Sequence, residues 1–199
     1  MKQKENKLKK RWIAREYSLS WKFILSCKNF IFLTFGIFII SAFLGYFFPN
    51  FFEKQILEFL KSLISDTENL SWIQMIIYLF QNNLMSAFLG MILGVFLGIF
   101  PLITSIVNGY LIGFVVNKSV TSEGFSILWR LFPHGIFELP ALFLSLGIGI
   151  RLGMFLFSRK PLSNLRNDFS DALRVFIFVI FPLLLVAACI EGTLIVFFG

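Results

Sequence analysis

The most informative part of the sequence is residues 132–153, which read FPHGIFELPALFLSLGIGIRLG. This stretch is long and apolar enough to cross a bilayer, since a spanning helix needs about 20 mainly apolar residues. It also carries His134 and Glu138, whose spacing of four residues places both side chains on one face of a helix. An ionisable group inside a membrane costs roughly 2.5–3.5 kcal/mol unless it is paired or hydrated. The stretch therefore predicts a membrane span with a polar face directed at other helices.

The composition agrees with a membrane protein. Of the 199 residues, 57% are hydrophobic and 18% are aromatic, whereas soluble domains are about 45–50% apolar. The surplus of apolar side chains must face lipid. The two cysteines, Cys27 and Cys189, lie in different predicted segments and lack the paired spacing of a disulfide framework or a zinc site.

Positive charge is concentrated at the N-terminus. Nine of the eighteen Lys and Arg residues lie in residues 1–28, opposed there only by Glu5 and Glu16. Because Lys and Arg accumulate in cytoplasmic segments, this bias predicts a cytoplasmic N-terminus. Nucleic-acid binding is not expected, because the basic segment runs directly into a span instead of forming a folded basic surface with aromatic readers. Residues 1–28 form either a basic tail or a helix in the headgroup layer, with these side chains at the membrane surface: Lys9, Lys10, Arg11 and Arg15.

Two further segments are predicted to be amphipathic helices at the membrane surface. In residues 51–64, apolar side chains recur at helical spacing opposite Lys54, Glu58 and Lys61. The charges around this segment are balanced or mildly acidic, in contrast to the basic N-terminus, so it is placed on the external side. Residues 72–82 are the second amphipathic segment.

The apolar run over residues 84–117 is too long for one span. As a single helix its 34 residues would measure about 50 Å, more than the roughly 30 Å of a hydrocarbon core. We expect the chain to fold back at Pro101, which gives short arms over 84–100 and 102–117 that either span the membrane or re-enter from one face. Glycines four residues apart let helix backbones approach closely. The helix-packing role is assigned to Gly90, Gly94, Gly98, Gly109 and Gly113.

These segments predict an all-α polytopic membrane protein of the cell membrane. The loop after the central stretch is basic and therefore cytoplasmic, so the last span leads outward and the C-terminus is external. Residues 1–28 precede a single transmembrane domain over 29–198. Its spans, about five in number and including the short Pro-broken hairpin, are expected at about 29–48, 84–100, 102–117, 132–157 and 175–198.

Several polar residues are predicted to gather in the outer half of the membrane. Their depth follows from their position along each helix, at 1.5 Å per residue. Three roles stay open for such a cluster, namely a structural polar core, an ion or proton pathway, and catalysis. Arg151 lies near the inner end of its span and is expected to reach the headgroups. The cluster comprises His134, Glu138, Glu191, Asn108, Asn82 and Asn83.

The common catalytic motifs do not occur in the sequence. A zinc protease of the HExxH type needs two histidines, and the chain has one. There is no GxSxG nucleophile motif and no GxxxxGK[ST] or GxGxxG phosphate-binding loop. We therefore expect no catalytic residues and no cofactor, while a metal site built from the histidine and the two glutamates stays open.

The same stretches resemble the stage II sporulation protein M family of integral membrane proteins. The resemblance covers about residues 25–198. It is carried by FQNNLMSAFLGMILGVFLGIFPLITSIVNGYLIGFVV from residue 80, by the late CIEG, and above all by the PHGxxExPA core. In that family the sporulation member is regarded as a scaffold in the membrane complex that drives engulfment, alongside partners that remodel peptidoglycan. Relatives also occur in organisms that never sporulate, so the resemblance implies fold and location more than role. The core residues are Pro133, His134, Gly135, Glu138, Pro140 and Ala141.

Two functional hypotheses follow from these observations. The first is a non-enzymatic membrane scaffold, whose partners are the lipid bilayer, other membrane proteins and, as an open alternative, a second copy of the chain. The second is a small transporter or channel-like protein, in which the polar cluster lines a vestibule that opens outward. Interrupted spans such as the one at Pro101 favour the second hypothesis, whereas the glycine rows favour the first.

Overall fold

The computed structural model describes residues 2–124 and 128–198, with side chains described for residues 10–122 and 135–197. Within these ranges the chain is helical and contains no strand. Five helical segments are long and apolar enough to cross a membrane. The prediction of an all-α membrane protein with about five spans is therefore confirmed. The five segments are Lys28–Phe47, Trp72–Val95, Ile99–Ser122, Gly135–Phe157 and Pro161–Phe197.

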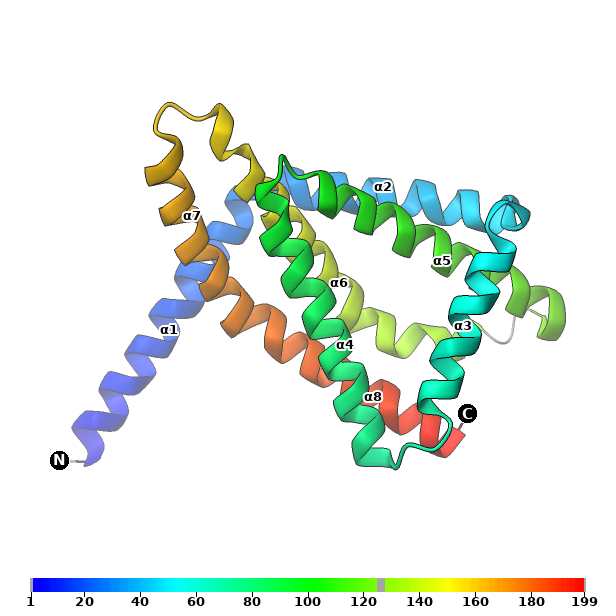
Figure 1. Ribbon diagram of the computed structural model, residues 1–199. Coiled ribbons are helices and arrows are strands. Elements are labelled where there is room, and N and C mark those ends of the chain that lie inside the picture. Colours follow the sequence, from blue (N-terminus) through cyan, green and yellow to red (C-terminus); the bar gives the residue numbers. More distant parts are fainter. Residues whose placement is uncertain (1, 125–127, 199) are drawn as a thin grey trace.

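The spans are built from five main helices and their short extensions (Figure 1). Short 3-10 or π segments adjoin several of these helices near the turns. The elements of the spans are α2 (Lys28–Phe47), α4 (Trp72–Ile92) with η2 (Leu93–Val95), α5 (Ile99–Glu123), α6 (Leu128–Gly153) with η4 (Met154–Phe157), and α8 (Phe181–Phe198), which the π-helix η5 (Phe176–Ile180) joins to α7 (Pro161–Val175).

Amphipathic helices lie at the two ends of the bundle. Helix α1 (Lys2–Ser26) packs against α7 at the end where α2 begins, which Figure 1 shows at the left. The short helix η1 (Pro49–Phe51) and helix α3 (Glu53–Thr67) lie at the opposite end. Both ends therefore carry helices with one polar and one apolar face, the arrangement typical of segments at a membrane surface.

Helix α6, which contains most of the central stretch, is the hub of the bundle. It packs against α2, α4, α5 and α8. Inside its span 56% of the residues are buried, against 17–33% in the other four spans. Figure 1 shows that α6 bends partway along its length, and Pro140 in its interior accounts for a bend because it removes a backbone hydrogen bond.

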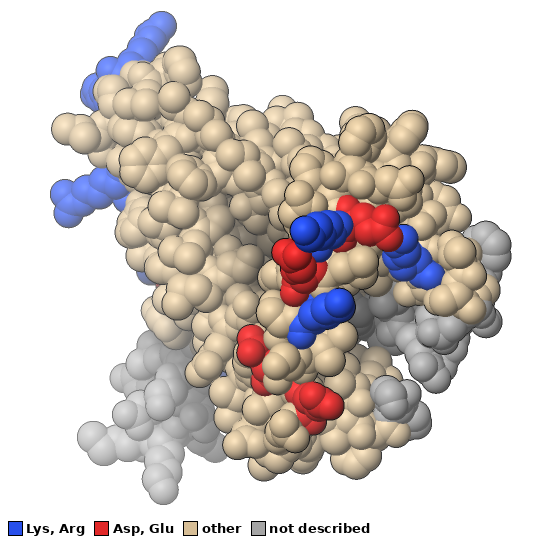
Figure 2. Space-filling view, turned by 45° about the vertical axis from the view of Figure 1, so that its right-hand side comes forward, with Lys and Arg blue, Asp and Glu red and all other residues tan. Residues whose placement is uncertain are grey.

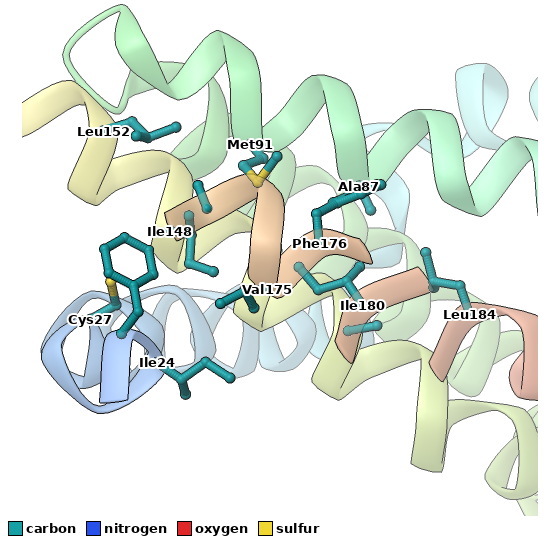
Figure 3. Packing of buried hydrophobic residues seen from close by; sticks show 13 residues of the cluster. Ile24, Cys27, Ala87, Met91, Ile148, Leu152, Val175, Phe176, Ile180 and Leu184 are labelled. Carbon is teal, nitrogen blue, oxygen red and sulfur yellow. The ribbon is translucent and has the colours of Figure 1, made fainter. Parts of the chain in front are cut away.

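A buried cluster of apolar side chains joins the end of α1 to the spans (Figure 3). Its members come from four stretches that are far apart in the sequence, so it fixes how the amphipathic layer sits on the bundle. The cluster includes Ile24 and Cys27 at the end of α1, Ala87 and Met91 of α4, Ile148 and Leu152 of α6, and Val175, Phe176, Ile180 and Leu184 of the α7–α8 segment.

The fold-back inside the long apolar run lies earlier than Pro101. The chain turns over residues 93–98, where Leu97 and Gly98 adopt positive φ values of 57° and 71°. Glycine populates this left-handed region without a steric penalty. Pro101 falls in the first turn of α5, where a missing N–H costs little because that N–H has no partner inside the helix. Both arms are consequently full-length spans, longer than the predicted pieces over 84–100 and 102–117.

Other boundaries also differ from the prediction. Helix α4 is unbroken from Trp72 to Ile92, so the separate amphipathic segment over 72–82 and its span form one helix. The backbone N–H of Ser71 donates to Gln74 Oε1 (2.9 Å) and marks the start of this helix. The predicted cytoplasmic loop before the last span is mostly the helix α7. The polar residues in these two segments suggested breaks in the helices. The apolar residues around them keep the helices continuous.

Candidate functional site

Helices α2 and α5 are joined by hydrogen bonds from side chains to the backbone. Ser105 Oγ donates to the carbonyl of Thr34 (2.7 Å), and Asn117 Nδ2 donates to the carbonyl of Tyr46 (3.0 Å). Both pairs are separated by 71 residues, so the two helices run parallel and in register over three turns. Ser41 Oγ adds a bond to the carbonyl of Ile106 (2.6 Å). These bonds satisfy polar groups that lipid could not.

Glycines bring the backbones of α2 and α5 into contact. A Cβ atom at Gly109 would overlap the carbonyl of Phe38, and one at Gly113 would overlap the carbonyl of Ala42. From the other side, a Cβ at Gly45 would overlap the carbonyl of Tyr110. We call this contact the α2–α5 seam. It is the small-residue packing typical of helix pairs in membranes.

A second seam joins α4 and η2 to α6. Its helices also run parallel, because positions 90, 94 and 98 meet progressively later positions of α6. A Cβ at Gly94 would overlap the backbone of Gly149, and a Cβ at Gly90 would lie 2.7 Å from Leu146 Cδ2. Ser145 Oγ donates to the carbonyl of Ala87 beside these glycines. Gly98 lies against Ile150, and Gly153 lies against η2 and the turn.

The predicted polar residues do not form one hydrogen-bonded cluster in the described part of the chain. Asn108 Nδ2 donates to the carbonyl of Thr104, one turn earlier in its own helix (2.8 Å). Asn82 is exposed and Asn83 is half-buried on α4. No hydrogen bond joins any two of Asn82, Asn83, Asn108 and Glu191 there. Glu138 is half-buried and engaged with a partner, while the side chain of His134 lies outside the described residues.

Glu191 is the most unusual of these residues. It lies on α8, which packs against α4 and α6. Its Oε2 atom is buried and has no hydrogen-bond partner among the described residues. The neighbouring Gly192 faces α4, since a Cβ there would lie 2.6 Å from Ile76 Cγ1. Nearby, Trp72 Nε1 donates to Thr193 Oγ1 (3.2 Å) and ties α4 to α8.

A set of ion pairs joins α1, α6 and α7, and the sequence alone does not predict it. Arg151 Nε lies 2.9 Å from Asp168 Oδ2, so Arg151 pairs with α7, whereas it was expected to reach the headgroups. Arg174 Nε lies 2.8 Å from Glu16 Oε2, and Arg174 also contacts Asp171. The available signal was the presence of acidic residues among the basic ones in both segments. Which acidic residue pairs with which arginine depends on how the three helices cross.

The described residues offer no evident site for a metal ion. No three of their His, Cys, Asp and Glu side chains are placed to hold one. Cys27, in the bend between α1 and α2, is fully buried, and burial raises its pKa to about 11. A metal-ligating or nucleophilic cysteine needs the thiolate form, so Cys27 acts as a packing residue. Cys189 is exposed on the surface of the bundle.

These features define a polytopic α-helical membrane protein whose spans are joined by two glycine seams. The family described as Stage II sporulation protein M matches residues 34–194, which cover most of the chain, and the protein belongs to this family. The resemblance carried by the PHGxxExPA core is thereby confirmed. No curated protein and no solved structure matches the chain.

Proposed function

We propose that the protein is a non-enzymatic scaffold of the cell membrane, which holds other membrane proteins through contacts made by its spans. The observation that carries this proposal is the pair of glycine seams. Helices that touch backbone to backbone have little freedom to slide, because any shift drives carbonyl groups into each other. Two such seams, one between α2 and α5 and one between α4 and α6, favour one fixed arrangement of the spans. A fixed surface is what a scaffold needs.

The outer flank of α2 is a surface that a partner span can use. Large apolar side chains on this helix point away from the α2–α5 seam, with exposed fractions of 70% for Phe32, 65% for Ile40 and 61% for Phe43. Outside the most apolar stretches, the described chain offers mainly the amphipathic helices α1 and α3 and the polar first part of the last segment, α7. Partner contacts are therefore expected mainly within the bilayer.

Photo-crosslinking in living cells tests this proposal. A crosslinking amino acid at Phe43 should capture specific membrane proteins, whereas the same amino acid at the fully buried Phe114 should capture none. The captured proteins should lose their association with one another when the chain is deleted. Re-expression of a Gly36→Ala variant should restore that association, and a Gly45→Ala variant should restore it less well. Captured proteins that stay associated without the chain would contradict the scaffold role.

A second candidate function, ion or proton transport, is favoured by Glu191. A carboxylate in a span without a hydrogen-bond partner is costly unless it binds a proton, a cation or water. The buried Oε2 atom of Glu191 fits such a site.

The Glu191→Gln variant separates the two candidate functions, because it keeps the shape of the side chain and removes the charge. A scaffold predicts unchanged or higher thermal stability and an intact association of partners. A transporter predicts the loss of proton or cation flux into proteoliposomes at unchanged stability. Absence of flux through the wild-type protein would exclude the second candidate.

A further inference from the structure

The end of the bundle that carries α1 and α7 has more positive charge than its own acidic groups can neutralise. The acidic side chains described there are Glu16, Asp168 and Asp171, and each is paired with Arg151 or Arg174. The described acidic side chains at this end are therefore not available to neutralise further cations.

The remaining cations at this end are exposed and have no ion pair within the described residues. Four of them lie along α1, one begins α2, two lie in the turn that leads into α7, and one lies on α7 itself. Figure 2 shows the contrast with the opposite end, where lysines and acidic groups alternate on the face that carries α3. We call these exposed cations the basic end, which consists of Lys10, Arg11, Arg15, Lys22, Lys28, Arg159, Lys160 and Arg166.

Aromatic side chains place the basic end at the level of a membrane surface. Trp12 and Tyr17 of α1 contact the ring of Phe178 edge-on, with centroid distances of 5.7 and 5.9 Å. Phe178 lies in η5, where the last span emerges from α7. Trp12 and Trp21 are nevertheless 54% and 62% exposed. Trp and Tyr side chains that are half packed and half exposed at the end of a span are typical of the headgroup layer.

The turn before α7 shows the same combination of apolar and basic side chains. Phe157 and Leu162 are 73% and 79% exposed, and Arg159 and Lys160 lie between them in the sequence. Apolar side chains can enter the acyl region here while the cations reach the phosphates.

We propose that the basic end binds anionic phospholipid headgroups of the leaflet on which α1 lies. A lipid phosphodiester with a net negative charge supplies the counter-ions that the protein lacks, and its acyl chains meet the exposed aromatic and aliphatic groups. A soluble polyanion such as a nucleic acid would satisfy the cations and leave those apolar groups in water. The combination of charge and apolar surface thus favours a lipid.

The test compares lipids retained by purified full-length protein from bilayers that contain equal amounts of phosphatidylglycerol and phosphatidylcholine. The wild-type protein should retain phosphatidylglycerol at least threefold over phosphatidylcholine. The Arg11→Gln/Arg15→Gln variant should retain both lipids nearly equally. The matched control, Lys54→Gln/Lys61→Gln, removes the same charge from exposed positions of α3 and should keep the wild-type ratio. Enrichment should also fall as salt is raised.

Three outcomes would overturn the proposal. These are equal retention of both lipids by the wild-type protein, an equal loss in both double variants, and binding of a short oligonucleotide to the protein in phosphatidylcholine nanodiscs that the α1 variant abolishes. If the glutamine variant folds poorly, Arg11→Lys/Arg15→Lys keeps the charge and should restore the wild-type lipid ratio. Its failure to do so would equally count against headgroup binding.

Discussion

The α2–α5 seam makes a quantitative prediction about two glycines of the same helix. Gly45→Ala places a methyl group against the carbonyl of Tyr110 and 3.0 Å from the backbone nitrogen of Phe114. Backbone atoms cannot move aside as a flexible side chain can, so the helices must separate. Gly36→Ala meets no atom within 4 Å outside its own helix. The two variants therefore make the same chemical change in opposite environments.

The expected cost of Gly45→Ala follows from two contributions. Overpacking of a close contact costs about 1–3 kcal/mol. Separation of the helices also weakens the bonds from Ser105 and Asn117 across the seam, each worth roughly 0.6 kcal/mol in a membrane protein. We expect a loss of about 2–4 kcal/mol for Gly45→Ala and a change within about 0.5 kcal/mol for Gly36→Ala.

Reversible unfolding in mixed micelles with rising denaturing detergent measures both values. Gly113→Ala, which overlaps Ala42 from the opposite helix, should cost as much as Gly45→Ala. The double variant should cost less than the sum, because helices that are already separated accommodate a second methyl group. Equal stability of Gly36→Ala and Gly45→Ala would refute the seam as a source of stability.

Three further predictions concern the amphipathic layers. In a variant without the other cysteine, Cys27 should react with an alkylating reagent only as the pH approaches its raised pKa of about 11, while the unfolded chain should react near the ordinary thiol pKa of about 8.5; fast reaction of the folded protein at pH 8 would contradict this. Arg174→Gln should free α1 from α7 by breaking the pair with Glu16, and hydrogen exchange in α1 should rise roughly tenfold, which corresponds to about 1.4 kcal/mol; unchanged exchange would leave the pair without a role. For a cytoplasmic N-terminus, an impermeant thiol reagent added to intact cells should label Ser65→Cys and spare Ser163→Cys, and the reverse pattern would invert the topology.

The number of spans could be predicted from the sequence, because the hydrophobicity of a span is the sum of contributions from neighbouring residues. About 20 apolar residues must cross a bilayer whatever else the chain does. The rows of glycine also predicted close contacts between helices, since glycine has no side chain to keep two backbones apart. Gly90, Gly94, Gly109 and Gly113 each lie against another helix in the structure.

The position of the fold-back was not determined in this way. Proline marks a turn in sequence, yet it is also tolerated in the first turn of a helix. Only the packing of η2 against α6 selects the turn over residues 93–98 and leaves Pro101 inside α5. Proline is compatible with a turn and with the first turn of a helix, and the contact between η2 and α6 determines which of the two occurs.

The pairing of the helices and the partners of the polar groups depend on contacts between distant segments. The sequence shows that glycines at positions 109 and 113 seek a partner helix, and only the fold selects α2 for them and α6 for those at 90 and 94. Likewise Asn108, expected in a polar cluster, bonds to its own helix at Thr104. Helices that are far apart in the chain pair where they cross. The free energy of each crossing comes from residues on both helices, so a pattern within one segment does not reveal it.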